Sequence, residues 1–277
     1  MCAVTVSGGI YKRLFTQNNL RMSIKAALID LSGTLHIEDE PTPSAVEALK
    51  RLRDTNIHIK FVTNTTKESR KTLHNRLTKI GFELQADEIY SSLSAAAKYV
   101  EKEKLNPLYL VSEDARKDFS APIDDRPLDS VVVGLAPSEF YYENLNKAFK
   151  LLMSNKNNRL VAIHQGKYYK RNDGLALGPG AFIKGLEYAT STNSVLIGKP
   201  NEYFFRNAIP EGICSEECVM IGDDPYDDIA GAMKLGLKGI QVKTGKYLAD
   251  VMITPPPTVV VENFSEAVDW LIAKNLE

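Results

Sequence analysis

Four short segments of the chain carry side chains that are suited to phosphoryl chemistry, and three of them contain carboxylates or hydroxyls. They are Asp30–Thr34, Thr63–Thr66, Lys199–Pro200 and Asp223–Asp228. Each follows a short apolar run, so all four would meet at one sheet edge if those runs are parallel strands. Carboxylates gathered there without enough cationic partners would repel one another and be costly to desolvate. A bound divalent cation is therefore expected to compensate them.

These residue types fit hydrolysis of a phosphoryl group through a covalent intermediate. A carboxylate such as that of Asp30 can attack phosphorus and form an aspartyl-phosphate, which divides one difficult step into two. Asp30 and Asp223 together suit Mg²⁺, which prefers hard oxygen ligands, few protein carboxylates and retained waters. The Thr63 hydroxyl and the backbone N–H groups of a following helix start can hold phosphoryl oxygens. Lys199 supplies a positive charge for the nucleophile and for developing negative charge.

The pattern around these segments alternates between strand and helix, which indicates a parallel sheet covered by helices. Apolar runs predict strands at 25–31 and 57–63, and helical spacing predicts helices at 44–53 and 67–80. The alternation returns near the C-terminus, with strands at 194–198, 218–222, 239–242 and 259–261 and helices at 203–209, 227–235 and 265–274. The predicted fold class is α/β with a Rossmann-like core, and its strand ends carry the four segments.

A second α/β unit is predicted in the middle of the chain. Apolar runs at 108–111 and 131–135, a helix at 139–153 and a further segment at 159–165 precede a glycine-rich stretch at 174–180. We therefore expect an N-terminal extension of residues 1–24, a core domain of residues 25–91 and 192–277, and an inserted domain of residues 92–191. Residues 168–180 are expected to form a hairpin and turn that can face substrate. The stretch lacks the spacing of a dinucleotide fingerprint, and no P-loop sequence occurs.

Composition excludes several classes of protein. The 277 residues are 44% hydrophobic and 25% charged, as in ordinary globular proteins. Lys and Arg total 34 against 35 Asp and Glu, so no net field favours nucleic acid or an anionic membrane. Cys2, Cys214 and Cys218 are too few for a disulfide framework, which favours a cytoplasmic protein. The first 29 residues contain no Asp or Glu, so a mitochondrial address is the alternative.

The four segments also resemble those of a known family. DLSGT (Asp30–Thr34), TNTT (Thr63–Thr66), GKP (Gly198–Pro200) and GDDPYDD (Gly222–Asp228) resemble the motifs of the haloacid dehalogenase-like phosphatase superfamily. The similarity spans about residues 25–276. It implies that the inserted segment is the larger, C2-type cap of that superfamily. Caps of this type often dimerise in relatives, so the resemblance is also compatible with a homodimer.

The resemblance implies a role for each matching residue. Asp30 would be the nucleophile and a Mg²⁺ ligand, with the Ser32 carbonyl and Asp223 as further ligands and Asp224 or Asp228 orienting coordinated waters. On the substrate side, Thr63 and Asn64 would bind the phosphoryl group beside Ser32, and Lys199 would neutralise charge. The cap would close over the site and select the leaving group.

Ser32 departs from the usual pattern of the superfamily. Most of its phosphatases have a second Asp two residues after the nucleophile, which acts as general acid and base. Such help is worth ~10²–10⁴-fold in rate, or ~3–5 kcal/mol of barrier. Its loss should slow alkyl phosphates most, because an alkoxide leaves poorly, and pyrophosphate or phosphoramidates least. We predict a phosphorylated small molecule or phospho-amino acid as substrate, with phosphoramidate or pyrophosphate bonds first and small phosphate esters second. The alternative is a phosphate-binding or scaffolding protein that has lost efficient catalysis.

Other polar residues have structural interpretations. Asp227 lies in the first turn of a predicted helix, where the dipole favours acidic residues, and is expected to do nothing else. His36 is interpreted as a turn residue, and His58 and His74 as members of a strand and a helix. No role can be assigned to His164 from the sequence.

Overall fold

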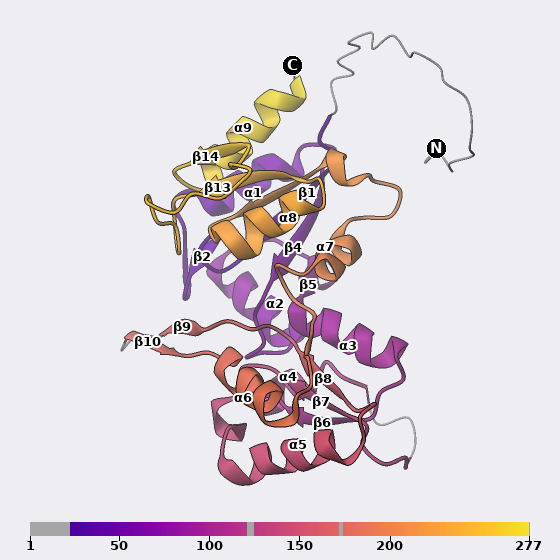
Figure 1. Ribbon diagram of the computed structural model, residues 1–277. Coiled ribbons are helices and arrows are strands. Elements are labelled where there is room, and N and C mark those ends of the chain that lie inside the picture. The colour runs from indigo at the N-terminus through magenta and orange to yellow at the C-terminus, as the bar shows by residue number, and fades with distance from the viewer. Residues whose placement is uncertain (1–22, 121–124, 172–173, 277) are drawn as a thin grey trace, which may run out of the picture.

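Two separate parallel sheets organise the chain. A computed structural model describes residues 23–120, 125–171 and 174–276. Figure 1 shows one sheet in the upper half of the molecule and the other in the lower half, with the helix Ser92–Lys102 (α3) between them. Most of the predicted N-terminal extension lies outside the described residues. None of the described helices has the length and apolar character needed to cross a membrane.

The larger sheet has six parallel strands in the order β14-β13-β12-β1-β4-β5. They are β1 (Ala26–Asp30), β4 (His58–Thr63), β5 (Ile89–Ser91), β12 (Cys218–Gly222), β13 (Lys238–Val242) and β14 (Val259–Val261). The helices of this half are α1 (Ala45–Arg53), α2 (Arg70–Ile80), α7 (Glu202–Ala208), α8 (Gly231–Lys234) and α9 (Phe264–Leu276). This sheet confirms the predicted α/β core.

Helices cover both faces of the six-stranded sheet. In β1, Ala27 and Ile29 pack with residues of α1, α2 and α9, whereas Ala26 and Leu28 pack with α3, α7 and α8. Every residue of β1 and β12 is buried. This two-sided burial explains why these strands are continuous apolar runs rather than alternating ones.

The smaller sheet has four parallel strands in the order β11-β8-β7-β6. They are β6 (Pro107–Leu110), β7 (Ser130–Val133), β8 (Arg159–Ala162) and β11 (Val195–Leu196), with the helices α4 (Glu113–Arg116), α5 (Tyr142–Ser154) and α6 (Gly180–Thr190). The predicted hairpin is present as the antiparallel pair β9 (Tyr168–Arg171) and β10 (Gly174–Leu177). One face of this sheet packs on α5 and α6. The other face packs with α3 and with residues of the larger sheet in a single hydrophobic cluster.

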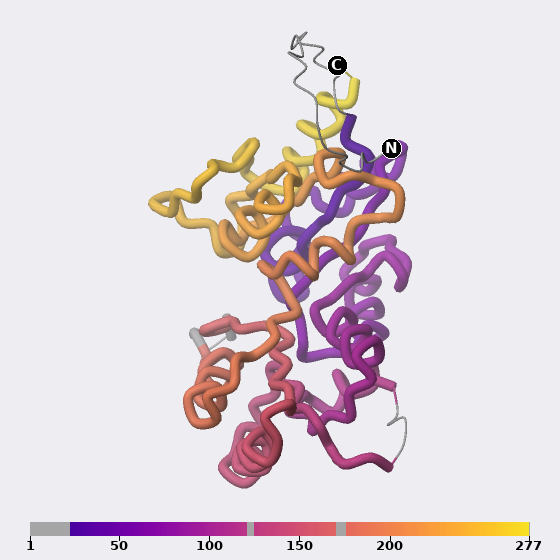
Figure 2. The backbone as a smooth tube through the Cα atoms, turned by 45° about the vertical axis from the view of Figure 1, so that its right-hand side comes forward, coloured from indigo at the N-terminus to yellow at the C-terminus, as the bar shows by residue number. Residues whose placement is uncertain are grey.

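The strand predicted at 194–198 belongs to a different sheet from the one expected. Its residues were assigned to the core half, but β11 pairs with β8, with Val195 opposite Val161. Figure 2 shows the orange segment that follows rising from the lower half into the upper half. Gly198 N donates to Ile163 O at 2.9 Å, so the chain is still bonded to the end of the smaller sheet there. An apolar run predicts a strand but does not identify its partner.

Short elements complete the structure and refine two predicted helices. A short hairpin of two-residue strands, β2 (His36–Ile37) and β3 (Glu40–Pro41), follows β1. Turns of 3₁₀ helix occur at Ala86–Glu88 (η1), Pro137–Glu139 (η2) and Ser215–Glu217 (η3). The helix predicted from residue 67 begins at Arg70, because the Ser69 side chain accepts from Thr72 N. The helix predicted at 227–235 is a π-helical turn at Pro225–Ala230 (η4) followed by α8.

Candidate active site

Three neighbouring strands place the candidate residues at one edge of the larger sheet. β1 lies between β12 and β4, so the ends of these strands carry Asp223, Asp30 and Thr63 side by side. Lys199 reaches the same edge from the segment that enters the core after β11. The structure therefore brings together the segments that the sequence analysis singled out, because the strands are parallel and adjacent.

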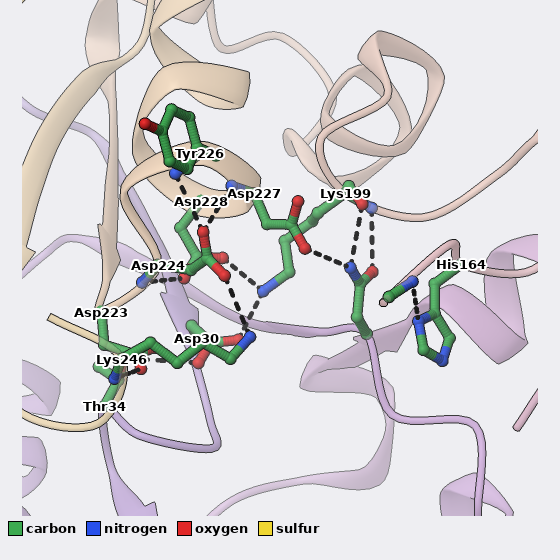
Figure 3. A network of polar contacts seen from close by, with 12 residues as sticks. Asp30, Thr34, His164, Lys199, Asp223, Asp224, Tyr226, Asp227, Asp228 and Lys246 are labelled. Carbon is green, nitrogen blue, oxygen red and sulfur yellow. Dashed lines mark hydrogen bonds and ion pairs between the residues drawn. The ribbon is translucent and has the colours of Figure 1, made fainter. Parts of the chain in front are cut away.

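Lys199 lies at the centre of the site, between two carboxylates (Figure 3). Its Nζ is 2.5 Å from Asp30 Oδ1 and 2.6 Å from Asp228 Oδ1, and it donates to Val62 O at 3.3 Å. The three charged side chains are each less than a tenth exposed. Burial disfavours the positive charge of Lys199, but Asp228 and Asp30 outweigh it and raise the lysine pKa above its ordinary value. Lys199 is therefore a permanent cation.

One lysine does not compensate the carboxylates around it. Burial, with the nearby charge of Asp30, raises the pKa of Asp223 to about 7. Burial also raises the pKa of Asp228 well above its ordinary value, against the opposing effect of Lys199. Ligand atoms of Asp30, Asp223 and Asp228 all lie within 4.8 Å of one another. Three buried carboxylate oxygens at this spacing fit a hard divalent cation such as Mg²⁺.

Two glycines allow the chain to close around Asp223. Gly33 and Gly245 have φ of +96° and +59°, and a Cβ on either would lie 2.2 or 2.1 Å from Asp223 Oδ2. The Thr244 hydroxyl donates to Gly33 O, which joins the two loops. Lys246 N donates to Asp223 Oδ2 at 2.7 Å. Asp223 is therefore held between the loop after β1 and the loop after β13.

The structure separates Asp224 from Asp228, which the sequence left as alternatives for orienting metal-bound waters. Asp228 belongs to the group of three buried carboxylates, because the π-helical turn returns it to the site. Asp224 does not belong to that group. Its Oδ1 accepts from Tyr226 N and Asp227 N at 3.0 and 2.9 Å, and its Oδ2 pairs with Lys246 Nζ at 3.0 Å. Asp224 thus caps the turn and holds a second lysine.

Asn64 contacts the backbone of Lys199. Lys199 N donates to Asn64 Oδ1 at 2.9 Å, and Asn64 Nδ2 donates to Lys199 O at 3.0 Å. Gly198 permits this approach, since a Cβ there would lie 2.5 Å from Asn64 Oδ1. The Asn64 carboxamide, predicted to bind the phosphoryl group, therefore positions Lys199 in this structure. Thr63 Oγ1 accepts from Thr65 N at 3.2 Å, so its hydroxyl hydrogen can be donated elsewhere.

In the loop after β1, Ser32 precedes a turn and Thr34 lies within it. Ser32 is exposed and forms an isolated bridge with His36. The Thr34 hydroxyl lies 3.4 Å from Asp30 Oδ2, on the carboxylate oxygen that Lys199 does not contact. Ser32 is therefore beside the nucleophile candidate, at the position where an acid–base Asp is usual in the family it resembles.

Comparisons with known proteins show the family of this chain. A family model described as haloacid dehalogenase-like hydrolase matches residues 27–121, and a related hydrolase model matches residues 196–267. Haloacid dehalogenase-like hydrolase domain-containing protein 2 of Mus musculus is 50% identical over 255 residues, which are 91% of this chain and 97% of that protein. The chain belongs to the haloacid dehalogenase-like hydrolases.

Several relatives within this family are phosphatases. Phospholysine phosphohistidine inorganic pyrophosphate phosphatase of Danio rerio is 34% identical over 257 residues, covering 90% of this chain and 95% of that protein. The structure of 4-nitrophenylphosphatase from Thermotoga maritima superposes with a TM-score of 0.81 at 25% identity, over 90% of this chain and 98% of the other. A glycerol phosphate phosphatase of Mycobacterium tuberculosis, solved in complex with calcium, has a TM-score of 0.76 at 25% identity, over 87% and 74% of the two chains. The chain is thus an enzyme of the haloacid dehalogenase-like phosphatases, with a C2-type cap.

Two residues of this hydrolase site were not selected from the sequence. Lys246 lies in the loop after β13, where a Thr-Gly-Lys sequence after a predicted strand could have indicated it. His164 follows β8 of the cap, and its Nδ1 accepts from Gly166 N at 3.2 Å. Burial and the charge of Lys246 lower the pKa of His164 to about 4. Asp227, predicted to be idle, lies 3.5 Å from Asn64 Nδ2, within the network drawn in Figure 3.

Proposed function

We propose that this enzyme is a Mg²⁺-dependent phosphatase that forms an aspartyl-phosphate on Asp30. The observation that carries the proposal is the buried Asp30 carboxylate, which shares Lys199 with Asp228. Its oxygen also lies within 4.8 Å of a carboxylate oxygen of Asp223. Binding a phosphate group would not by itself require a carboxylate at that position, because a carboxylate repels the anion. A nucleophile is required there, and the resident cations offset the repulsion.

The reaction divides into two balanced displacements. In the first, the Asp30 carboxylate attacks phosphorus, and the bond to the leaving atom breaks with its electron pair on the leaving group. In the second, water attacks the phosphoryl group and gives up a proton to solvent, and the bond between phosphorus and Asp30 breaks with its electron pair on the carboxylate, giving orthophosphate. Lys199 remains charged throughout and stabilises negative charge on the transferring group. The Thr63 hydroxyl can donate to a phosphoryl oxygen.

The carboxylates of Asp30, Asp223 and Asp228 are the candidates to hold Mg²⁺, with the Ser32 carbonyl as the further ligand implied by the family. When bound, Mg²⁺ neutralises charge on the carboxylates and on the phosphoryl oxygens. Asn64 positions Lys199 beside these carboxylates through two hydrogen bonds to the Lys199 backbone. Gly33 and Gly245 keep Asp223 in place.

Ser32 supports a substrate whose leaving group needs little protonation. Pyrophosphate has such a leaving group, a phosphoramidate nitrogen takes its proton readily from water, and an alkoxide leaves poorly without a proton from the enzyme. A relative that is 34% identical is named for phospholysine, phosphohistidine and inorganic pyrophosphate. We therefore place phosphoramidate or pyrophosphate bonds first and small phosphate esters second. Ser32→Asp should raise the rate on alkyl phosphates more than on pyrophosphate, and an unchanged alkyl-phosphate rate would contradict the argument.

The decisive experiment is phosphate release at neutral pH from pyrophosphate, imidodiphosphate, p-nitrophenyl phosphate and a sugar phosphate. Each is measured with Mg²⁺ and with EDTA. Asp30→Asn is the catalytic blank, and Asp54→Asn is the matched control, because Asp54 is an exposed residue after α1. Release that needs Mg²⁺ and Asp30, but not Asp54, supports the proposal. No release above the blank from any substrate would instead favour a phosphate-binding protein.

A further inference from the structure

Lys246 is a second cation of the site and differs from Lys199 in its surroundings. The Lys199 side chain is 3% exposed and contacts two carboxylates, whereas that of Lys246 is 66% exposed and pairs with Asp224 alone at 3.0 Å. Burial at the site opposes its charge, but Asp224 outweighs this and raises the Lys246 pKa. Lys246 is therefore a charged amino group that a ligand can reach.

The backbone fixes the position of Lys246 beside the reacting group. Its N–H donates to Asp223 Oδ2 at 2.7 Å, so the lysine begins directly next to a candidate metal ligand. The neighbouring Gly245 can pack against Asp223 only because it has no Cβ. An ammonium group has three donors, and the pair with Asp224 uses one. Two donors remain for a ligand at the edge of the site.

Asp224 is arranged to hold this lysine. One of its oxygens accepts the backbone N–H groups of Tyr226 and Asp227, which fixes the carboxylate on the π-helical turn. Its other oxygen contacts Lys246 Nζ. Because both oxygens are engaged in this way, Asp224 acts as a positioning residue for Lys246.

His164 belongs to the cap, and Figure 3 draws it on the opposite side of the polar network from Lys246. Its Nδ1 accepts from Gly166 N, so the ring hydrogen of the neutral form lies on Nε2. The imidazole is therefore an uncharged donor on the cap side, separate from the cation that Lys246 supplies.

We propose that Lys246, positioned by Asp224, binds anionic oxygens of the leaving group and makes the site prefer phosphoanhydrides such as pyrophosphate. The inference rests on the proposed phosphatase function. In pyrophosphate, the bond from phosphorus to the bridging oxygen breaks, its electron pair stays on the departing phosphate, and Lys246 stabilises that anion. An amine that leaves from a phospholysine becomes a cation on protonation and is repelled by Lys246. A p-nitrophenyl group carries no charge outside the reacting phosphoryl group.

The kinetic test compares two substrates in Lys246→Met at one fixed free Mg²⁺ concentration. The ratio of kcat/KM for pyrophosphate to that for p-nitrophenyl phosphate should fall about tenfold or more, as for a lost charge-assisted hydrogen bond. Lys246→Arg should keep most of the ratio. Lys243→Met is the matched control, because Lys243 lies in the same loop but pairs with Glu262 at 2.5 Å. Equal losses on both substrates in Lys246→Met would overturn the proposal.

A binding test separates this inference from the proposed function. In an Asp30→Asn background, calorimetry compares imidodiphosphate with orthophosphate, with and without Lys246→Met. Lys246→Met should weaken the binding of imidodiphosphate about tenfold more than it weakens the binding of orthophosphate. An absence of turnover in the wild-type enzyme would refute the proposed phosphatase function. The calorimetric comparison would still decide the role of Lys246. Equal weakening of both ligands would refute that role.

Asp224→Asn distinguishes a lysine-positioning role from a metal role. The variant should lower the ratio of kcat/KM for pyrophosphate to that for p-nitrophenyl phosphate, but by less than Lys246→Met does. The Mg²⁺ concentration for half-maximal activity should stay unchanged. A raised Mg²⁺ requirement with an unchanged ratio would assign Asp224 to metal-bound waters and overturn its part in the proposal.

Discussion

Two groups of carboxylates, one at the active site and one at the boundary between core and cap, are built in opposite ways. At the site, Asp30, Asp223 and Asp228 gather around a single buried lysine. At the boundary, Asp114 accepts from Ser69 N at 2.7 Å, and Asp118 accepts from Arg70 N at 2.9 Å. The boundary group thereby ties α4 of the cap to the start of α2 in the core.

The pKa directions follow from burial and from these partners, and the boundary is not uniform, because burial raises the pKa of Asp118 despite the Arg70 N–H. Burial and Asp30 raise the pKa of Asp223 to about 7, whereas the Ser69 N–H lowers that of Asp114 far below its ordinary value. A carboxylate satisfied by backbone donors stabilises the fold as it stands. Buried carboxylates with too few cationic partners stabilise the fold less, but they can bind a cation. The comparison indicates that the boundary serves structure and that the site gives up stability for function.

The largest expected effect comes from removing the one buried cation of the site. Lys199→Met should lower kcat by ~10²–10³-fold, because the developing charge loses its partner. It should also lower the free energy of unfolding in EDTA by about 3–5 kcal/mol, because two buried carboxylates lose their shared partner. Steady-state kinetics and urea unfolding measure the two effects, with the exposed Lys234→Met as control. Unchanged stability would remove the contrast with the boundary.

Adding a cation should have the opposite effect on stability. Mg²⁺ at about 100 times its Kd should stabilise the native enzyme by ~2.7 kcal/mol, a rise of several degrees in Tm. Asp223→Asn should abolish this rise, and Asp114→Asn should keep it, because only the site carries unbalanced charge. Thermal unfolding with Mg²⁺ or EDTA gives the result. A full rise in Asp223→Asn would show that the cation binds elsewhere.

At the boundary, the expected effect is smaller and is confined to stability. Asp114→Ala removes the acceptor for Ser69 N and should cost about 1–2 kcal/mol of unfolding free energy. The neighbouring Glu113→Ala, an exposed change in the same helix, should cost less than about 0.5 kcal/mol. Urea unfolding compares the two variants. Equal costs would mean that the boundary carboxylate contributes nothing specific.

The smallest effect concerns His164, which follows β8 in the cap. Its folded-state pKa of about 4 lies below the ordinary 6.5, so the unfolded chain takes up the proton first as the pH falls. The associated stability is complete above pH 6.5 and is lost between about 6.5 and 4. Between pH 7 and pH 5.5 the His164→Gln variant should therefore lose about 1 kcal/mol less unfolding free energy than the wild type. Parallel unfolding curves would contradict the assignment.

Local pattern was enough to predict the elements that carry the site. The run ending at Asp30 was predicted as a strand at 25–31 and is β1, Ala26–Asp30, because a strand buried on both faces must be continuously apolar. The same signal misassigned β11, since sheet membership depends on a partner distant in sequence. Lys246 was missed for a related reason, because its relation to Asp223 and Asp224 arises only when the loop after β13 folds against them.

By itself, the sequence determined which chemistry this chain carries: strand-ending carboxylates, a threonine turn and one lysine, in an order typical of its family. These features are local, because residue type and hydrophobic period suffice to specify them. The tertiary structure decided which carboxylates share the lysine, which one holds Lys246, and that Asn64 supports Lys199. Asp224 and Asp228 are near neighbours in the chain, and only the π-helical turn sends one to the site and leaves the other at its edge. Charge interactions depend on distance and burial in three dimensions, and those quantities are set by packing between elements far apart in the sequence.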